Sequence, residues 1–398
     1  MAEPRRIVIV GTGLAGASAA GALREQGFDG EVLLVGEQRY RPYELPALSK
    51  GILLGDTEDP DWVHDESFYT EKNIDLRLRT RVGAIDPANR TADVDGTPEP
   101  WDRLLLATGS TPRRLRVPGA ELDGIRRLRR LDDARDLRKE FVAGRRVVIV
   151  GAGWIGCEAA AAARKHGAEV TVVDPLPLPL HRVLGDTVGG VFRRMHEAEG
   201  VTFRLGVGVA EYVGADGVAT GVRLDDGSEV SGDVLLLAVG ARPRTELAQD
   251  AGLAMAEGAG IEVDETLRTS APDVYAAGDI AAHLHPGYGH RVRIEHWANA
   301  KDQGTHVAQN LLGANEPFLA SPYFFTDQYD LGCEYRGLAD PAADELVIRG
   351  DLAAREFTAF WLREGRVRAA MNVNQWDDGE ALQLLVDAQA EVTPEQLR

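Results

Sequence analysis

The stretch that decides the fold is IVIVGTGLAG, residues 7–16. Its first four residues are β-branched, a pattern typical of a short buried parallel strand. Gly11, Gly13 and Gly16 then follow with the spacing Gly-x-Gly-x-x-Gly, and an alanine-rich segment typical of a helix continues to about residue 26. The first glycine permits a sharp turn, the second lets a pyrophosphate approach the backbone, and the third lets the helix pack on the strand. The stretch predicts a βαβ unit that binds a phosphate at its helix N-terminus.

The same pattern occurs a second time, as VVIVGAGWIG at residues 147–156, again followed by an alanine-rich segment. In each unit the next strand ends in an acid, Glu37 in the first and Asp174 in the second. A carboxylate at this position can bind ribose hydroxyls. Two complete motifs in one chain predict two dinucleotide-binding modules in tandem.

Each module continues with alternating residues and Asp-Gly turn signals, which are typical of β-hairpins. Each then closes on an apolar strand, LLLATG at 104–109 and LLLAVG at 235–240. The residues expected to contact dinucleotides are Gly11, Gly13, Leu14, Ala15, Gly16, Ala107, Thr108 and Gly109 in the first module, and Gly151, Gly153, Trp154, Ile155, Gly156, Asp174 and Gly240 in the second.

Composition narrows the function further. The 398 residues suggest two or three domains, and the net charge of −19 argues against a nucleic-acid-binding protein, which needs a basic surface. We expect a cytoplasmic chain, because it shows no signal peptide and no apolar membrane span. The two cysteines, Cys157 and Cys333, are far apart and are expected to be buried residues of a helix and a strand. No metal site is expected.

Three further motifs carry a resemblance to a known family: ELPALSK at 44–50, ATG at 107–109 and VYAAGDIA at 274–281. With the two glycine motifs, they resemble the FAD-dependent pyridine nucleotide reductases, and more narrowly the ferredoxin reductases of bacterial oxygenase systems. The resemblance covers nearly the whole chain. It implies an α/β fold with two tandem Rossmann-like dinucleotide-binding domains, arranged as in glutathione reductase, and a C-terminal α+β domain. The implied parts are an FAD-binding domain at 1–112 and 241–318, an NAD-binding domain at 113–240 and the C-terminal domain at 319–398.

The resemblance also implies roles for individual residues. In that family FAD is held by residues that match Ala15, Glu37, Lys50, Val82, Arg129 and Asp279, and the flavin lies near the position of Trp297. The matching lysine pairs with a glutamate that corresponds to Glu158, which we expect to start the helix of the second module and to benefit from its dipole. Our hypothesis is that this pair orients the nicotinamide over the flavin and that Lys50 stabilises charge on the reduced ring. Lys50, Glu158 and Trp297 are therefore the expected catalytic residues.

Simpler interpretations of the same residues remain open. Asp279 follows a glycine at a strand end and could cap a helix. Lys50 could be a solvated surface charge, and Trp297 could be an ordinary core residue at the start of a helix.

The route by which electrons leave is indicated by a missing thiol. Disulfide reductases of this fold carry a CxxxxC pair after the first βαβ unit, whereas the stretch EQRYRPYELPALSK at 37–50 has no cysteine. We expect NADH to reduce FAD by hydride transfer, and FAD to pass single electrons to a small iron–sulfur ferredoxin that serves an oxygenase. Two alternatives remain: an NADH:quinone reductase, which the acid-rich tail at 377–398 does not favour, and an NADH-sensing flavoprotein.

The remaining predictions concern the nucleotide and the partner. Asp174 repels a 2′-phosphate and residues 175–180 (PLPLPL) contain no Lys or Arg, which favours NADH over NADPH. We expect a monomer or weak dimer. A basic stretch at 113–130 is either a solvated connection or a docking site for an acidic ferredoxin, and its basic residues are Arg113, Arg114, Arg116, Arg126, Arg127, Arg129 and Arg130.

Overall fold

The computed structural model describes residues 3–398, and its internal contacts divide the chain into two compact units. Unit 1 comprises Met1–Glu44, Asp61–Thr111 and Arg242–Pro322, and unit 2 comprises Leu45–Pro60, Pro112–Ala241 and Tyr323–Arg398. The three-part division by cofactor stays a prediction. The division by contacts groups 45–60 and the C-terminal part with the second glycine motif.

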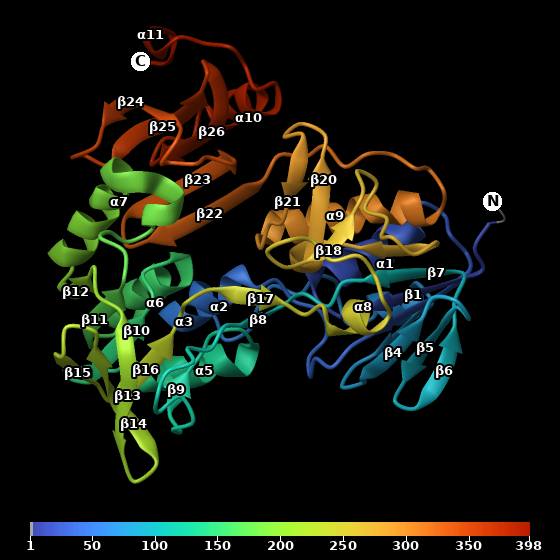
Figure 1. The fold of residues 1–398 in the computed structure, drawn as a ribbon, viewed down its shortest axis with the longest axis horizontal. Coiled ribbons are helices and arrows are strands. Elements are labelled where there is room, and N and C mark those ends of the chain that lie inside the picture. The colour runs from blue at the N-terminus through green and yellow to red at the C-terminus, as the bar shows by residue number, and fades with distance from the viewer. Residues whose placement is uncertain (1–2) are drawn as a thin grey trace. The chain divides into compact units, whose positions relative to one another are not determined.

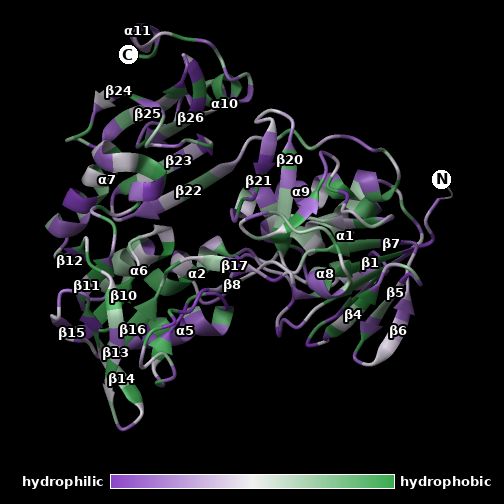
Figure 2. Cartoon of the chain, viewed as in Figure 1, coloured by the Kyte–Doolittle hydropathy of each residue, from purple (hydrophilic) through white to green (hydrophobic). Residues whose placement is uncertain are grey.

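Unit 1 is built on a five-stranded parallel sheet with the order β19-β7-β1-β2-β3. Figure 1 labels two of its neighbouring strands, β1 and β7. Its central strand is β1 (Arg6–Val10), in which the four β-branched residues are between 0% and 3% exposed. The neighbouring strands are β2 (Glu31–Val35), β3 (Ile74–Arg77), β7 (Arg103–Leu106) and β19 (Val274–Ala276). After their first residue, β1, β2 and β7 are entirely apolar, which suits a sheet buried on both faces. Figure 2 colours most of β1 and β7 as hydrophobic.

Helices and smaller sheets complete unit 1. Helix α1 (Leu14–Glu25) follows β1, and α9 (Trp297–Leu311) packs along it. Strands β4 (Val82–Asp86), β5 (Thr91–Val94) and β6 (Thr97–Pro100) form an antiparallel sheet. A second small sheet contains β18 (Ile261–Val263), β20 (Ala281–His285) and β21 (His290–Val292). The short helices are α4 (Phe68–Glu71), α8 (Glu246–Asp250) and the 3₁₀ turn η1 (Gly278–Ile280).

Unit 2 repeats the same design, as the duplicated glycine motif predicts. Its parallel sheet has the order β12-β11-β10-β16-β9, with β10 (Arg146–Val150) in the central position that β1 has in unit 1. The other strands are β9 (Ile125–Arg126), β11 (Glu169–Asp174), β12 (Val201–Leu205) and β16 (Val234–Leu237). The helices are α5 (Leu131–Glu140), α6 (Trp154–Lys165) and α7 (His181–Ala198), with α2 (Pro46–Ser49) and α3 (Gly51–Leu54) from the earlier segment.

The predicted hairpins follow each module. In unit 2 they form the sheet of β13 (Val209–Ala215), β14 (Val218–Leu224) and β15 (Glu229–Ser231). The turn between β5 and β6 has Asp95 and Gly96 at φ 49° and 83°, and the turn between β13 and β14 has Asp216 and Gly217 at 51° and 80°. Two successive positive φ values define a type I′ turn, which explains the Asp-Gly sequence at both places. The chain passes between the units in β8 (Ser110–Pro112) and β17 (Ala241–Pro243).

The C-terminal part is an antiparallel sheet with helices, as the alternating sequence predicts. Its order is β22-β23-β26-β25-β24. Trp361, Phe357 and Phe360 of β25 are at most 1% exposed, and one hydrophobic core joins this sheet to α7. The elements are β22 (Tyr323–Gln328), β23 (Leu331–Gly337), β24 (Glu345–Asp351), β25 (Glu356–Arg363), β26 (Arg366–Val373), α10 (Gly379–Asp387) and α11 (Pro394–Leu397).

Candidate functional site

The first glycine loop, in unit 1, lies between the end of β1 and the start of α1. Gly11 has a φ of 124°, and a Cβ atom there would lie 2.0 Å from the carbonyl oxygen of Ala107. A Cβ at Gly16 would lie 2.0 Å from the carbonyl oxygen of Gly11. A Cβ at Gly13 would lie 3.9 Å from the side-chain nitrogen of Gln38, the nearest described atom outside its chain neighbours. The first and third glycines are therefore required by packing, while the second borders open space.

The N-terminus of α1 fits a phosphate group. No side chain caps it within residues 3–398, and its first turn contains no acidic residue. The Thr12 hydroxyl is buried in this loop without a hydrogen-bond partner among the described residues. Free backbone N–H groups with a partial positive charge bind anions, so the loop suits the pyrophosphate that the sequence predicts.

Helix α9 and the turn η1 cover this end of α1. A Cβ at Gly304 of α9 would lie 2.3 Å from the carbonyl oxygen of Ala15, and a Cβ at Gly278 would lie 3.2 Å from the Ala15 Cβ. The Gln303 amide oxygen accepts a hydrogen bond of 2.8 Å from the Gly278 N–H. The first glycine loop is thus closely covered by residues that lie far from it in the sequence.

Asp279 lies within η1, and its carboxylate accepts a hydrogen bond of 2.7 Å from the Ser110 hydroxyl. The N-cap of this turn is Ala277, so the alternative in which Asp279 caps a helix is wrong. Because Ser110 follows the ATG motif directly, the Ser110 bond brings two predicted motifs of unit 1 together.

Glu37 lies two residues beyond the end of β2, and its side chain is 40% exposed. It pairs with Arg244 at 2.7 Å. The Thr108 hydroxyl donates to the Arg244 carbonyl oxygen at 2.6 Å. Arg244 was not among the predicted residues, because nothing in its local sequence links it to Glu37 across 207 positions.

Trp297 is the first residue of α9 and is half-buried, which does not match an ordinary core residue. The Lys301 ammonium lies 5.0 Å from the centre of its ring system, a cation–π arrangement. Burial raises the pKa of Glu44, while the Lys301 ammonium and the Trp297 side chain oppose that rise. Val82, another predicted residue of unit 1, begins β4 and is buried in the core.

The second glycine loop, in unit 2, repeats the first. A Cβ at Gly151 would lie 2.3 Å from the Ala238 carbonyl oxygen, and one at Gly156 would lie 1.9 Å from the Gly151 carbonyl oxygen. Apart from Gly153 and its two chain neighbours, no described residue lies within 4 Å of the position that a Cβ at Gly153 would take. Ala238 occupies the place of Ala107 in the repeat. The sequence signal for it was the shared strand ending LLLA.

Asp174 builds the second loop from within. One of its oxygens accepts from the Ala152 N–H at 2.7 Å, and the other accepts from the Leu176 N–H at 2.8 Å. A carboxylate has about four acceptor positions, so both oxygens retain capacity for a further donor. Trp154 packs with Phe324, at 4.6 Å between ring centres, whereas Ile155 is 41% exposed beside the loop.

Lys50 and Glu158 form a buried ion pair in unit 2, with 2.6 Å between Nζ and Oε1. Their side chains are 16% and 5% exposed, which excludes a solvated lysine. Glu158 is the fifth residue of α6, so the expectation that it starts the helix is wrong, and the first turn contains no acid. Helix α6 begins instead at Trp154, directly after the glycine loop.

Two hydroxyl groups that the sequence did not indicate complete the environment of Glu158. Ser49 donates to Oε2 and Thr326 donates to Oε1, both at 2.5 Å. The Lys50 ammonium also lies 5.1 Å from the centre of the Phe325 ring. Thr326 and Phe325 belong to β22 of the C-terminal sheet, about 170 positions from Glu158, so local patterns cannot reveal the contact.

The two cysteines behave as expected. Cys157 lies in α6 and Cys333 in β23, and both are free and buried. Burial raises the pKa of both thiols. Neither thiol is therefore poised as a nucleophile, since reactivity requires the thiolate.

Arg129 donates its backbone N–H to Asp133, just before α5, at 3.0 Å.

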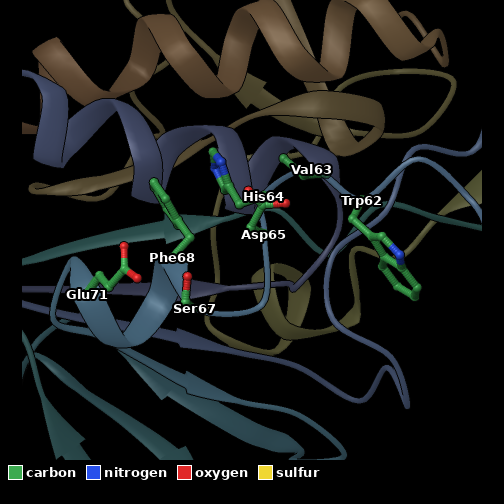
Figure 3. Close-up of a pocket in the computed structure, with 7 residues that line it drawn as sticks. All are labelled: Trp62, Val63, His64, Asp65, Ser67, Phe68 and Glu71. Carbon is green, nitrogen blue, oxygen red and sulfur yellow. The ribbon is translucent and has the colours of Figure 1, made fainter.

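A separate hollow in unit 1 is lined by Trp62, Val63, His64, Asp65, Ser67, Phe68 and Glu71, and Figure 3 shows His64 and Phe68 side by side in it. Their rings are stacked 3.8 Å apart, and none of the predicted site residues lines this hollow. No helix within residues 3–398 is long and apolar enough to cross a membrane.

The duplicated loops, each beneath a helix N-terminus, define a class: an oxidoreductase that binds two dinucleotides. Comparison with known proteins agrees. Residues 5–304 match the family model described as pyridine nucleotide-disulphide oxidoreductase, and residues 323–398 match the reductase C-terminal model. The chain belongs to the pyridine nucleotide-disulphide oxidoreductase family.

Individual relatives resemble the chain over nearly its whole length. The anthranilate 1,2-dioxygenase system ferredoxin–NAD(+) reductase component of Burkholderia cepacia is 41% identical, covering 98% of this chain and 96% of the relative. Rhodocoxin reductase of Rhodococcus erythropolis is 37% identical, covering 98% and 91%. The reductase in the crystal structure of the covalent putidaredoxin reductase–putidaredoxin complex has a TM-score of 0.94 at 34% identity, covering 99% and 95%.

These comparisons confirm four predictions made from the sequence: the family, the α/β fold with tandem Rossmann-like modules and a C-terminal domain, the oxidoreductase class, and the use of FAD with a pyridine nucleotide.

Proposed function

We propose that this chain is an NADH-dependent ferredoxin reductase that supplies electrons to an oxygenase. When bound, FAD accepts a hydride from NADH and releases electrons singly to an iron–sulfur ferredoxin. The observation that carries the proposal is the lack of an accessible thiol beside two dinucleotide loops: both cysteines are buried, and residues 37–50 contain none. The names of the relatives support the same activity.

The first loop would hold FAD. The backbone around Gly13 would receive its pyrophosphate, and the Thr12 hydroxyl is available as a donor. Asp279, Glu37, Val82 and the 107–109 segment would complete the site in unit 1, with Trp297 at the ring system. The close packing of α9 on α1 supports a rigid, preformed site, which suits a dinucleotide that is held permanently.

The second loop would hold the nicotinamide dinucleotide. The exposure of Ile155, at the position that Ala15 has in unit 1, supports a ligand that enters and leaves with each turnover. The Lys50–Glu158 pair would orient the nicotinamide, and the Lys50 ammonium would stabilise negative charge that develops on the reduced ring. The burial of the pair strengthens this electrostatic effect, because a surrounding of low polarity screens charge weakly.

NADH is proposed over NADPH. Asp174 presents a carboxylate at the strand end, and residues 175–180 offer no cation for a 2′-phosphate. His181 is already paired with Asp186 at 2.9 Å, while Arg182 is exposed. A comparison of kcat/KM for the two nucleotides tests this choice, and a larger value with NADPH would overturn it.

The arginines of residues 113–130 are proposed to dock an acidic ferredoxin. Arg113 and Arg126 also serve the fold, since Arg113 donates to the Ala241 carbonyl oxygen and Arg126 pairs with Glu140. Arg114, Arg116 and Arg130 are exposed. Against a net charge of −19, such a patch would steer the partner locally, and ferredoxin reduction would weaken as salt increases. Insensitivity to ionic strength would remove this proposal.

The central experiment mixes the purified holoenzyme with NADH and putidaredoxin without oxygen, and follows the ferredoxin spectrum. Reduction of putidaredoxin at a rate that saturates with its concentration supports the proposal. A parallel assay offers cytochrome c as a second one-electron acceptor. Bleaching of the flavin band by NADH without reduction of putidaredoxin or cytochrome c would favour the NADH-sensing alternative. Rapid reduction of a soluble quinone with no reduction of either protein would favour the quinone reductase.

A further inference from the structure

A buried chain of hydrogen bonds connects Glu158 to the C-terminal sheet and onward to α7. Thr326 donates to Glu158 at 2.5 Å and lies 3.1 Å from the amide nitrogen of Gln328. The amide oxygen of Gln328 is 2.8 Å from His196 Nε2. The other ring nitrogen of His196, Nδ1, is 3.3 Å from the Tyr329 hydroxyl. The chain thus crosses from α6 through β22 to α7.

The donor and acceptor groups of these residues allow only one direction of donation along this series of hydrogen bonds. A carboxylate only accepts, so the Thr326 hydroxyl donates to Glu158 and accepts from the Gln328 amide. The Gln328 oxygen then accepts from His196 Nε2–H. Burial lowers the pKa of His196 to about 4, so the ring is neutral and its Nδ1 accepts from Tyr329. Every proton in the chain points toward Glu158.

The residues of this hydrogen-bond series are also almost completely buried from solvent. Glu158 is 5% exposed, Thr326 and Gln328 are each 1% exposed, and His196 is fully buried. In such surroundings aligned hydrogen bonds polarise one another, and an unsatisfied polar atom costs more than it would at the surface. The Glu158 carboxylate is therefore held on both oxygens, by Ser49 on one and by Lys50 and Thr326 on the other.

We propose that Thr326 is a positioning residue that acts through Glu158, so that the C-terminal sheet controls the placement of the Lys50 ammonium. The inference rests on the proposed function, in which the Lys50–Glu158 pair orients the nicotinamide. The Thr326 hydroxyl is already bonded to Glu158 and Gln328, so it would act on the nucleotide only through Glu158. Its hydroxyl fixes the carboxylate rotamer, and the carboxylate in turn fixes Lys50.

The test replaces Thr326 with the isosteric valine and with serine, which keeps the hydroxyl. Thr358→Val is the matched control, because Thr358 is fully buried in β25 of the same sheet and its hydroxyl contacts Gln375. We expect T326V to slow NADH-dependent flavin reduction about tenfold, equivalent to about 1.4 kcal/mol. T326S restores the rate to within about twofold. T358V lowers Tm about as much as T326V and leaves the rate unchanged.

Two readouts separate positioning from a general structural defect. Calorimetry with NAD+ reports binding independently of turnover, and we expect T326V to raise its Kd severalfold while T358V does not. In the Glu158→Gln background, adding T326V is expected to change the rate by less than about twofold, because both substitutions act on the same group. If T326V does not fold, T326A removes the same hydroxyl and gives the same comparison.

The outcomes distinguish this inference from the function on which it rests. Equal rates and equal Kd values for T326V and T358V would overturn the positioning role. Additive effects of T326V and E158Q would also overturn it. If E158Q and K50M reduce the flavin as fast as the unmodified holoenzyme, the role of the ion pair fails, and this inference fails with it. A holoenzyme that NADH does not reduce would refute the proposed function itself.

Discussion

The two glycine loops have the same sequence pattern and nearly the same steric demands, yet they differ in what covers them. In unit 1, Gly304 of α9 presses against Ala15, so a helix from far along the chain closes over the loop. In unit 2, Ile155 takes the place of Ala15 and is 41% exposed, whereas Ala15 is 6% exposed. The difference shows that the elements packed on a βαβ unit, and not its glycine motif, set how closely the start of its helix is covered.

The acids at the second strand ends differ in the same way. Glu37 reaches outward and pairs with Arg244 at a site that is 40% exposed. Asp174 turns inward and binds two backbone N–H groups of its own loop. Equivalent positions in a repeat have therefore acquired different structural duties.

The largest expected effect concerns chemistry at the second loop. Lys50→Met is expected to slow flavin reduction by NADH about 100-fold in stopped-flow mixing, because it removes the positive charge that, in the proposed function, stabilises the reduced ring. The flavin is expected to stay bound, since the first loop is untouched. An unchanged rate constant would contradict the role of Lys50 in flavin reduction. Loss of flavin would show that Lys50 also contributes to FAD binding.

The next largest effect tests the cover of the first loop. Gly304→Ala places a Cβ 2.3 Å from the Ala15 carbonyl oxygen, so the two helices must separate. We expect a cost of about 2–3 kcal/mol, a Tm lower by about 5–10 °C, and loss of FAD on desalting. Gly190→Ala in α7 is the control, because its Cβ would meet only the flexible Arg194 side chain at 3.4 Å. Full retention of FAD by G304A would contradict the difference drawn between the loops.

Two buried histidines, one in each unit, are expected to make the stability of the protein depend on pH. Burial lowers the pKa of His283 in unit 1 and of His196 in unit 2 to about 4. Below about pH 6.5 the unfolded chain binds a proton that the native histidine does not, so stability is full above that pH and falls as the pH decreases toward 4. At pH 5 each histidine is expected to cost about 2 kcal/mol.

Urea unfolding at pH 7 and pH 5 measures this cost. His283→Gln and His196→Gln are each expected to reduce the difference in unfolding free energy between the two pH values by about 2 kcal/mol. Only H196Q is expected to slow flavin reduction as well, because His196 belongs to the chain that ends at Glu158. A pH dependence as steep as that of the unmodified protein in both variants would show that other groups dominate.

The smallest effect compares the two strand-end acids. Asp174→Asn replaces an acceptor of two backbone N–H groups by a side chain with one acceptor and one donor group, and we expect a loss of about 1–3 kcal/mol. Glu37→Gln weakens an exposed ion pair and is expected to cost less than about 1 kcal/mol. Chemical denaturation measures both. Equal losses of unfolding free energy in the two variants would contradict the difference in structural role between Asp174 and Glu37.

Much of the fold could be predicted, because its signals are local. The runs of β-branched residues, the glycine spacing and the Asp-Gly turns each act within a few residues, and they located both parallel sheets and the hairpins. The position of Glu158 was misjudged by a turn because the helix was expected to begin after the third glycine, whereas it begins just after the second, at Trp154. Arg244, Ser49 and Thr326 were missed because each meets its partner across at least 100 positions.

By itself, the sequence determined that this protein has two dinucleotide modules without a redox disulfide, because the glycines required by backbone geometry and the lack of a cysteine in residues 37–50 are visible residue by residue. Only the tertiary structure decided that α9 covers the first loop, that Asp174 turns inward, and that β22 brings a hydroxyl to Glu158. The physical reason is that burial and hydrogen-bond partners depend on segments distant in the chain, which local propensity does not specify.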